Sequence, residues 1–249
     1  SDAALLAEHF ERGAEPARAA MFYRLAAEAA LEGNDLEGAL ARAERGNACG
    51  ASGEELARLR IVEGEVHALR GQNTEAERCG SEVLALMPPG SAPWCWAAGT
   101  TAALRVMLGE VAAAREIAEA LANTVPRDGG AAVVHLRACA QAAPYILYAG
   151  HYDVARCLMA SAENAVHIDS TAAAASGWRD LTTTEVLAWT EGDNHEALIA
   201  ARSAQQSFRH ARSELAAAIA GIAVGKALAR LGLYRAAASE LADCVAIAD

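Results

Sequence analysis

Apolar side chains recur every three or four positions along most of the chain, as in Leu36, Leu40 and Ala43. This period places them on one face of a helix, so it predicts amphipathic helices and not strands. Glycines, prolines and short polar clusters interrupt the pattern and mark the helix ends. The predicted helices cover about residues 5–12, 16–32, 36–48, 54–70, 74–86, 93–108, 110–124, 131–149, 152–166, 171–191, 195–210, 213–231 and 234–248. Pro144 is expected to kink or divide the helix that reaches 149.

A glycine followed five positions later by a small residue recurs between these helices, as in Gly192 and Ala197. The glycines are 38 to 42 residues apart, which is in the range of stacked helical hairpins. We interpret each unit as the turn between two antiparallel helices, with the small residue where the second helix starts close beside the first. A bulky side chain there would cost about 1 to 3 kcal/mol through overpacking. The other members of the series are Gly33 with Gly38, Gly71 with Ala76, Gly109 with Ala114, Gly150 with Ala155, and Gly232 with Ala237.

The composition favours an all-α fold. Hydrophobic residues make up 53% of the chain and aromatic residues only 5%, so alanine supplies much of the apolar character, and alanine is the strongest helix former. A single hairpin cannot bury its apolar face without its neighbours. We therefore predict that residues 1–249 form one continuous domain of about 13 helices.

The repeat resembles the tetratricopeptide repeat, a helix pair with a glycine at its turn and an alanine five residues later. Pro88 and Pro126 stand seventeen residues after Gly71 and Gly109, where that family has a proline. The resemblance implies a right-handed α-solenoid of antiparallel helix pairs, and we call the fold tetratricopeptide-like (TPR-like) because the period exceeds ~34 residues. The family's small position, seven residues before the glycine, holds Ala26, Gly64, Ala102, Ala143 and Gly225, with Glu185 as the exception.

A second resemblance covers the stretch from Leu6 to Ala20, followed by the run from Ala26 to Ala29. It is similar to the start of the helical-repeat region that follows the ATPase module in large bacterial signalling proteins, including multidomain serine/threonine kinases and signal-transducing ATPases. All but one of the 21 basic residues are arginine, Lys226 being the exception, a bias typical of GC-rich bacteria. The resemblance implies a regulatory module and not an enzyme.

The net charge and the cysteine pattern limit the classes of partner and the cellular compartment. The net charge of −11 argues against nucleic acid or an anionic membrane as the main partner, because both require a basic surface. The six cysteines form no C-x-x-C pair, and no secretory signal precedes them, which is typical of buried thiols in the cytoplasm. The chain lacks an initiator methionine and stops inside an amphipathic run, so we expect a piece of a larger protein whose first residues are a cloning scar.

No motif predicts catalysis, a metal site or a cofactor. The stretch from Gly221 to Lys226 lacks the spacing and the hydroxyl of a phosphate-binding loop, and two glycines on one helix face are better explained by close packing. The seven histidines form no H-E-x-x-H, and none stands at metal-ligand spacing from a cysteine. Paired carboxylates such as Asp180 and Glu185 are interpreted as solvated helix faces. No serine or cysteine has an identifiable base near it in the sequence.

What remains is the concave groove that the tetratricopeptide resemblance implies. The family's groove positions fall on basic and aromatic residues in successive repeats, and this pattern suits an acidic peptide, because guanidinium groups pair with carboxylates and stack on aromatic rings. The alternative interpretation is that the arginines face water and the tryptophans lie in the core. The residues carried over are Arg58, Trp96, Arg137, Tyr148, Arg179, Trp189, Lys226 and Arg230, together with Tyr23.

Three functional hypotheses follow. The first is a non-catalytic module that binds a peptide or protein segment on its concave surface. The second is a ligand-sensing domain that binds a small molecule in the groove and controls an attached ATPase or kinase; a closed cavity would favour it, and an open groove would favour a peptide. The third is homodimerisation through the last helix, which requires that Leu241, Val245 and Ile247 be exposed.

Overall fold

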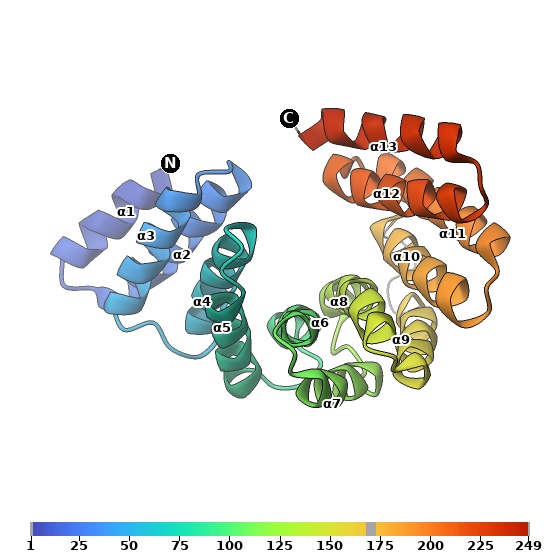
Figure 1. The fold of residues 1–249 in the computed structure, drawn as a ribbon. Helices are drawn as coiled ribbons and strands as arrows, with labels where there is room; N and C mark the ends of the chain where they lie inside the picture. Colours follow the sequence, from blue (N-terminus) through green and yellow to red (C-terminus); the bar gives the residue numbers. More distant parts are fainter. Residues whose placement is uncertain (1, 168–172, 249) are drawn as a thin grey trace.

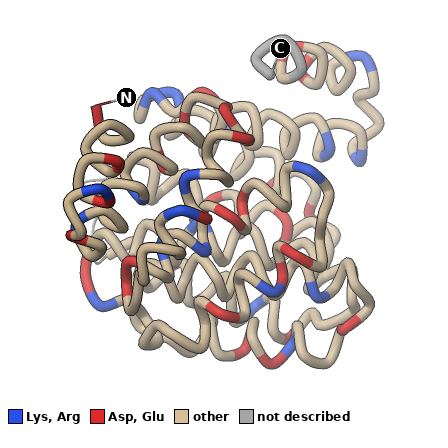
Figure 2. Tube along the Cα trace, turned by 90° about the vertical axis from the view of Figure 1, so that its left-hand side faces the viewer, with Lys and Arg blue, Asp and Glu red and all other residues tan. Residues whose placement is uncertain are grey.

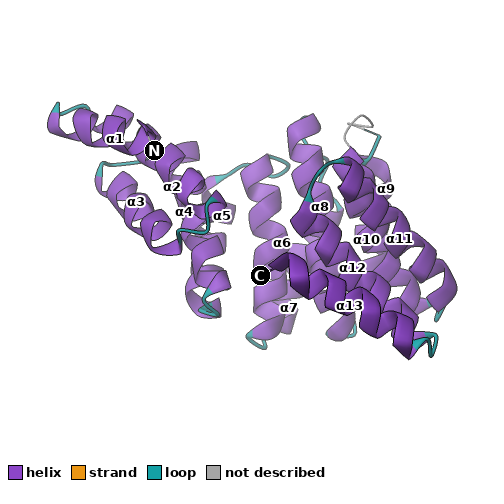
Figure 3. Ribbon diagram, turned by 90° about the horizontal axis from the view of Figure 1, so that it is seen from above, coloured by secondary structure: helices purple, strands orange, loops and turns teal. Residues whose placement is uncertain are grey.

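A computed structural model of the chain describes residues 2–167 and 173–248, and within these it describes the side chains of residues 2–167 and 174–244. Within these residues the chain forms thirteen α-helices and no strand, as Figure 3 shows. The helices are α1 (Asp2–Arg12), α2 (Pro16–Glu32), α3 (Leu36–Ala48), α4 (Gly53–Leu69), α5 (Asn73–Leu86), α6 (Ala92–Met107), α7 (Val111–Ala122), α8 (Gly129–Tyr148), α9 (Tyr152–Ala165), α10 (Ala173–Thr190), α11 (Asn194–His210), α12 (Glu214–Arg230) and α13 (Tyr234–Ala248). None of the described helices is long and apolar enough to cross a membrane.

The predicted helices are confirmed, most of them with ends within two residues of those observed. The first helix begins earlier than predicted, at Asp2 instead of Leu5. The predicted start at Thr171 lies outside the described residues. The division at Pro144 is wrong, because α8 runs unbroken to Tyr148. Pro144 removes only the backbone hydrogen bond that its own N–H would donate to the carbonyl four residues earlier, and the helix continues for one more turn.

The helices form a curved row. Each helix packs on its neighbours in the sequence, and the even-numbered helices from α2 to α12 also pack on one another in order. Figure 1 shows an arc in which α6, α8 and α10 lie toward the inner side and α7, α9 and α11 toward the outer side. The N-terminal helices and α13 lie at the two ends of this arc.

Glycines at the helix joints have the left-handed backbone conformation. Gly71, Gly109, Gly150, Gly192 and Gly232 all have positive φ values, which cost a residue with a Cβ about 1 kcal/mol or more. Four of these joints close in the same way, with the next N–H donating to the carbonyl five residues earlier, as from Gln72 N to His67 O at 2.9 Å. The alanine five positions after each glycine is buried. The interpretation of these residues as joints is therefore confirmed.

The first joint differs from the prediction by one residue. Gly33 has a φ of −83°, and Asn34 takes the left-handed conformation with a φ of 57°. The buried residue five positions later is consequently Ala39, with none of its surface exposed, and not Gly38. Asparagine tolerates this conformation better than most residues because its short amide can hydrogen-bond locally. The glycine pattern alone therefore put the register of this repeat one position too early.

Two further joints have the same conformation without any glycine at the left-handed position. Ala14 and Arg212 have φ values of 55° and 54°, and the alanines five residues later, Ala19 and Ala217, are buried. The joints after α1 and α11 thus repeat the geometry of those after α4 and α6. A search for glycine could not find them.

Small residues allow close packing between the helices. One close approach of two helix backbones is between α6 and α8, where a Cβ added to Gly99 would lie 2.6 Å from Cα of Ala138. At the position seven before the joint, a Cβ on Gly225 would lie 2.6 Å from Leu241 Cδ2. The packing role predicted for Gly221 and Gly225 agrees with their burial inside α12.

Candidate binding groove

Three of the predicted groove residues come together around one cavity. Arg58 from α4, Trp96 from α6 and Arg137 from α8 line a space of about 310 Å³ that is open to solvent on one side. The even-numbered helices place them there, because these helices pack on one another in order. We call this cavity the Trp96 pocket. Its other lining residues are Glu28, Leu31, Glu32, Ile61, Val62, Glu65, Ala92, Pro93 and Val134.

The Trp96 pocket has an apolar floor and charged walls of both signs. The Trp96 side chain is almost buried, with 7% of its surface exposed, and its indole N–H donates to Glu65 Oε1 at 2.9 Å. Arg137 lies 3.7 Å from the same carboxylate oxygen, which is too long for a strong hydrogen bond. The guanidinium of Arg137 therefore keeps donors free for a ligand, and about half of its side chain is exposed.

Arg58 is held more firmly on the opposite side of the pocket. It pairs with Glu54 one turn earlier on α4 at 3.0 Å and lies 4.0 Å from Glu28 on α2. The wall formed by α2 is acidic, because Glu28 and Glu32 both line the cavity. The pocket is consequently not the purely basic surface that the sequence predicts, since glutamates compete for its arginines.

A second group of predicted residues lies on α8, α10 and α12. The Tyr148 and Trp189 rings meet edge to face with centroids 5.1 Å apart, and Arg230 places its guanidinium carbon 5.4 Å from the Trp189 centroid. Both aromatic side chains are substantially exposed. Between α10 and α12, Lys226 lies 3.5 Å from Glu185, whose second carboxylate oxygen is buried without a hydrogen-bond partner. Asp180 and Glu185 are both buried, so their interpretation as a solvated helix face is wrong.

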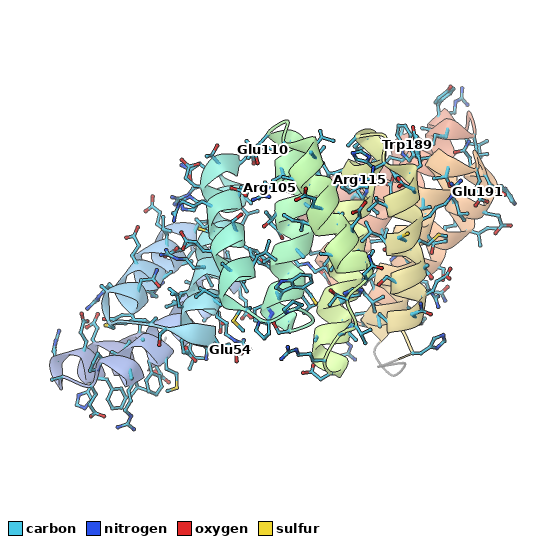
Figure 4. The ribbon with its side chains drawn as sticks, turned by 90° about the horizontal axis from the view of Figure 1, so that it is seen from below. Glu54, Arg105, Glu110, Arg115, Trp189 and Glu191 are labelled. Carbon is cyan, nitrogen blue, oxygen red and sulfur yellow. The ribbon has the colours of Figure 1, made fainter. Side chains whose placement is uncertain are left out.

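The two groups lie at opposite edges of the helix row. Arg58 is near the start of α4 and Arg137 lies in the first half of α8, whereas Trp189 and Arg230 occupy the last turns of α10 and α12. On α8, Arg137 of the first group and Tyr148 of the second are eleven residues apart, which is roughly 16 Å along the helix axis. Figure 4 shows Glu54, one turn from Arg58, at one edge of the molecule and Trp189 at the other. Seven of the eight residues therefore form two separate surfaces and not one continuous stripe.

Two predicted groove residues belong to neither group. Arg179 pairs with its neighbour Asp180, with its Nε 2.7 Å from Oδ1. Tyr23 is buried, and its hydroxyl donates to Glu11 Oε2 at 2.5 Å. Tyr23 is thus a core residue between α1 and α2, and its assignment to the groove is wrong.

Further ion pairs join neighbouring helices outside the two groups. Arg105 on α6 reaches Glu77 on α5 at 2.8 Å, and Arg115 on α7 reaches Asp153 on α9 at 3.1 Å. Figure 2 shows acidic and basic residues interspersed along the helices at the N-terminal end of the row. The exposed pair of Arg115 with Asp153 contributes little to stability.

A buried cluster around His135 was not found from the sequence. His135 Nε2 lies 2.9 Å from Ser161 Oγ and 3.6 Å from Cys139 Sγ, while Nδ1 lies 3.9 Å from Cys95 Sγ. The i, i+4 spacing of His135 and Cys139 was the signal that could have indicated it. Burial lowers the pKa of His135 to about 4 and raises the pKa of Cys95 to about 12. These groups are therefore neutral at pH 7.

The His135 cluster has neither the chemistry of a catalytic site nor that of a metal site. Ser161 and His135 are at the distance of a nucleophile and its base, but a histidine with so low a pKa is a weak base at neutral pH. A thiol, Cys95, stands where a carboxylate would orient the ring. The two sulfur atoms approach different ring nitrogens, and the described residues contain no group of three or more ligands able to hold a metal ion.

The cysteines are only partly buried, and the last helix is only partly described. All six thiols are free, and burial is confirmed for Cys79, Cys95, Cys139 and Cys244 but not for Cys49, which is half-buried, or for Cys157, which is exposed. On α13, Leu241 is 37% exposed, while the Val245 and Ile247 side chains lie outside the described residues. The dimer hypothesis therefore stays a prediction.

Comparison with known proteins adds no family. No family model matches the chain, and a search of the curated proteins found no match. The geometry of the helix row and its two surfaces is therefore what supports a function.

Proposed function

We propose that the chain is a non-catalytic binding module that recognises an extended peptide or protein segment on the inner side of the helix row. In this proposal the helices form a right-handed TPR-like solenoid. The module works in the cytoplasm as the regulatory part of a larger bacterial signalling protein with a kinase or ATPase domain. The observation that carries the proposal is the convergence of Arg58, Trp96 and Arg137 from three successive inner helices on one open cavity.

The open side of the Trp96 pocket favours a peptide over an enclosed small molecule. An apolar side chain of the peptide would rest on Trp96, Ile61 and Val134. A neighbouring carboxylate would accept hydrogen bonds from Arg137, whose donors are only loosely engaged. Such charge-assisted bonds are worth about 1.5 to 3 kcal/mol each.

The test uses peptides selected from a random display library on the isolated protein. Affinities of the selected peptides are then measured by fluorescence anisotropy for the wild type and for the Arg58→Glu and Arg137→Glu variants. Each reversal is expected to weaken binding about tenfold or more, since it replaces an attraction by a repulsion. Arg156→Glu is the matched control, because Arg156 is exposed on the outer helix α9.

Two outcomes would count against the proposal. In the first, no peptide is enriched over a bead control. In the second, the selected peptides bind the two pocket variants as tightly as they bind the Arg156→Glu control, while circular dichroism shows that all three variants are folded.

A small-molecule sensor is the second candidate. The volume of the Trp96 pocket, about 310 Å³, lies at the lower end of the range for ligand sites, roughly 300 to 1,000 Å³. Carboxylates and guanidinium groups on an apolar floor suit a ligand that carries both charges. A thermal-shift screen with amino acids and other small zwitterions tests this candidate; a shift abolished by Arg137→Glu would favour it over a peptide site.

A further inference from the structure

One face of α12 is exposed along its whole length and has two chemically different halves. Leu215, Ile219, Ile222, Lys226 and Arg230 follow one another at intervals of four, three, four and four residues, so they lie on a single narrow stripe of the helix. Leu215 is 72% exposed, and Ile219 and Ile222 are each 42% exposed. We call these five residues the α12 stripe. Its first half is apolar and its second half is basic.

The α12 stripe is not a part of the core that happens to be accessible. The remaining faces of α12 carry alanine, glycine, valine and leucine residues that are buried against α11 and α13, as at Ala220, Val224 and Leu228. The helix therefore has enough buried surface without the stripe. Three large apolar side chains in one exposed row are uncommon on a surface without a partner and indicate an interaction site.

The basic half of the α12 stripe continues onto the neighbouring helices. Arg230 lies over the Trp189 ring of α10, and Trp189 meets Tyr148 of α8. Lys226 has one carboxylate near it, Glu185 at 3.5 Å, and the ion pairs of the described residues include none with Arg230. This end of the stripe therefore keeps a net positive charge in a protein whose net charge is −11.

We propose that the α12 stripe binds an amphipathic helix of a partner protein whose exposed face is apolar in one half and acidic in the other. The alternation of four- and three-residue intervals is the spacing at which two helices interlock their side chains. The stripe extends for roughly 22 Å, about the length of a four-turn helix. The partner's apolar side chains pack on Leu215, Ile219 and Ile222, and its carboxylates meet Lys226 and Arg230.

This site is distinct from the Trp96 pocket. The pocket is built by α2, α4, α6 and α8, and the stripe lies on α12, with its basic end beside Trp189, which Figure 4 shows at the other edge of the row. The proposal therefore does not rest on peptide binding at Trp96. Substitutions also distinguish binding at the α12 stripe from binding at the Trp96 pocket, because Arg137→Glu leaves the stripe intact.

The experiment uses designed helical probes. A fluorescein-labelled peptide of about 16 residues carries leucines at the contact positions of its first half and glutamates at those of its second half, on a background of alanine and glutamine. A second peptide has lysines in place of the glutamates. Anisotropy titrations with the full chain are expected to show binding of the acidic peptide at least about tenfold tighter than that of the basic peptide.

Variants within the α12 stripe and on other surfaces show where the peptides bind. Arg230→Glu is expected to weaken the acidic peptide about tenfold and to strengthen the basic one. Ile222→Ser weakens both peptides, and Ile219→Ser provides a second apolar test in case one variant folds poorly. The matched controls are Arg235→Glu on α13 and Ile199→Ser on α11, which are exposed elsewhere and are expected to change neither affinity.

Three results would overturn the proposal. One is equal affinity of the acidic and basic peptides, and another is no saturable binding of the acidic peptide below about 1 mM. The third is an acidic peptide whose affinity falls with Arg137→Glu and not with Arg230→Glu or Ile222→Ser, which would place it in the Trp96 pocket.

Discussion

The α6–α8 junction and the α10–α12 junction join equivalent neighbours in the helix row, yet different residues build them. At α6–α8 the backbones approach so closely that Gly99 cannot carry a Cβ without meeting Ala138. At α10–α12 long side chains bridge the helices, as in the pairs of Lys226 with Glu185 and Arg230 with Trp189. Close packing leaves no room for a partner between the two backbones at Gly99, whereas Trp189, Lys226 and Arg230 lie exposed at the α10–α12 junction. The α6–α8 contact therefore fixes the two helices that carry Trp96 and Arg137, and the α10–α12 contact presents its own bridging side chains to solvent.

The strongest test of this comparison is Gly99→Ala. The added methyl group would lie 2.6 Å from Cα of Ala138, so α6 and α8 would have to separate, and we expect a loss of about 3 kcal/mol in the free energy of unfolding. Urea denaturation measures it. The matched control is Gly33→Ala, where φ is −83° and the nearest contact is an ordinary 3.4 Å. A loss below about 1 kcal/mol for Gly99→Ala would show that the junction is not closely packed.

A pH titration of stability examines the same middle region through His135. Its folded pKa of about 4 lies below the ordinary 6.5, so the unfolded chain binds the proton more tightly. The stabilisation is complete above pH 6.5 and is lost as the pH falls toward 4, and we expect about 2 kcal/mol less stability from this group at pH 5 than at pH 7.5. His135→Gln, which keeps a donor toward Ser161, should show a shallower pH dependence in urea unfolding. An equally steep profile in the variant would assign the effect to other groups.

At the C-terminal end, Arg212→Gly should increase stability. Arg212 occupies a left-handed joint with a φ of 54°, and glycine relieves the strain, for a gain of about 1 kcal/mol in a thermal or urea unfolding experiment. The reverse change, Gly232→Ala at a φ of 77°, should cost about the same. If Arg212→Gly were destabilising, its side chain would have to make contacts that outweigh the strain.

The smallest effect is expected for Arg230→Ala. The guanidinium lies over an exposed tryptophan ring, and an exposed cation–π contact contributes about 0.5 to 1 kcal/mol. Arg230→Lys should retain part of it. A loss above about 2 kcal/mol would mean that bridging side chains stabilise the α10–α12 junction as strongly as close packing stabilises α6–α8, and the comparison would fail.

Helix positions were predictable from the sequence, and the sites only in part. Apolar periodicity and left-handed glycines are local signals, so helices and most joints were placed correctly, whereas Ala14, Asn34 and Arg212 adopt the joint conformation without the glycine signal. Groove residues depend on contacts between distant repeats. The sequence could not indicate that Glu65 would accept a hydrogen bond from Trp96 or that Glu28 would approach Arg58.

The α12 stripe shows the limit of a prediction made from family positions alone. Ile219, Lys226 and Arg230 could each be assigned to a groove by their distance from Gly232. Only the exposure of these side chains in the structure identifies them as a surface stripe, because the buried residues Ala220 and Val224 have the same helical spacing. Periodicity locates a face, and only packing decides whether that face is covered.

The glycine joints between the helices are positions at which the chain can vary in length. A Cβ added at Gly71, Gly109, Gly150, Gly192 or Gly232 would meet nothing within 4 Å, so these turns project away from the packed helices. Lengthening such a loop costs little, about 0.6 kcal/mol for each doubling of its length. Each joint is therefore a position where residues can be inserted without disturbing the neighbouring repeats, and a new recognition loop grafted there would change what the row binds without changing how it folds.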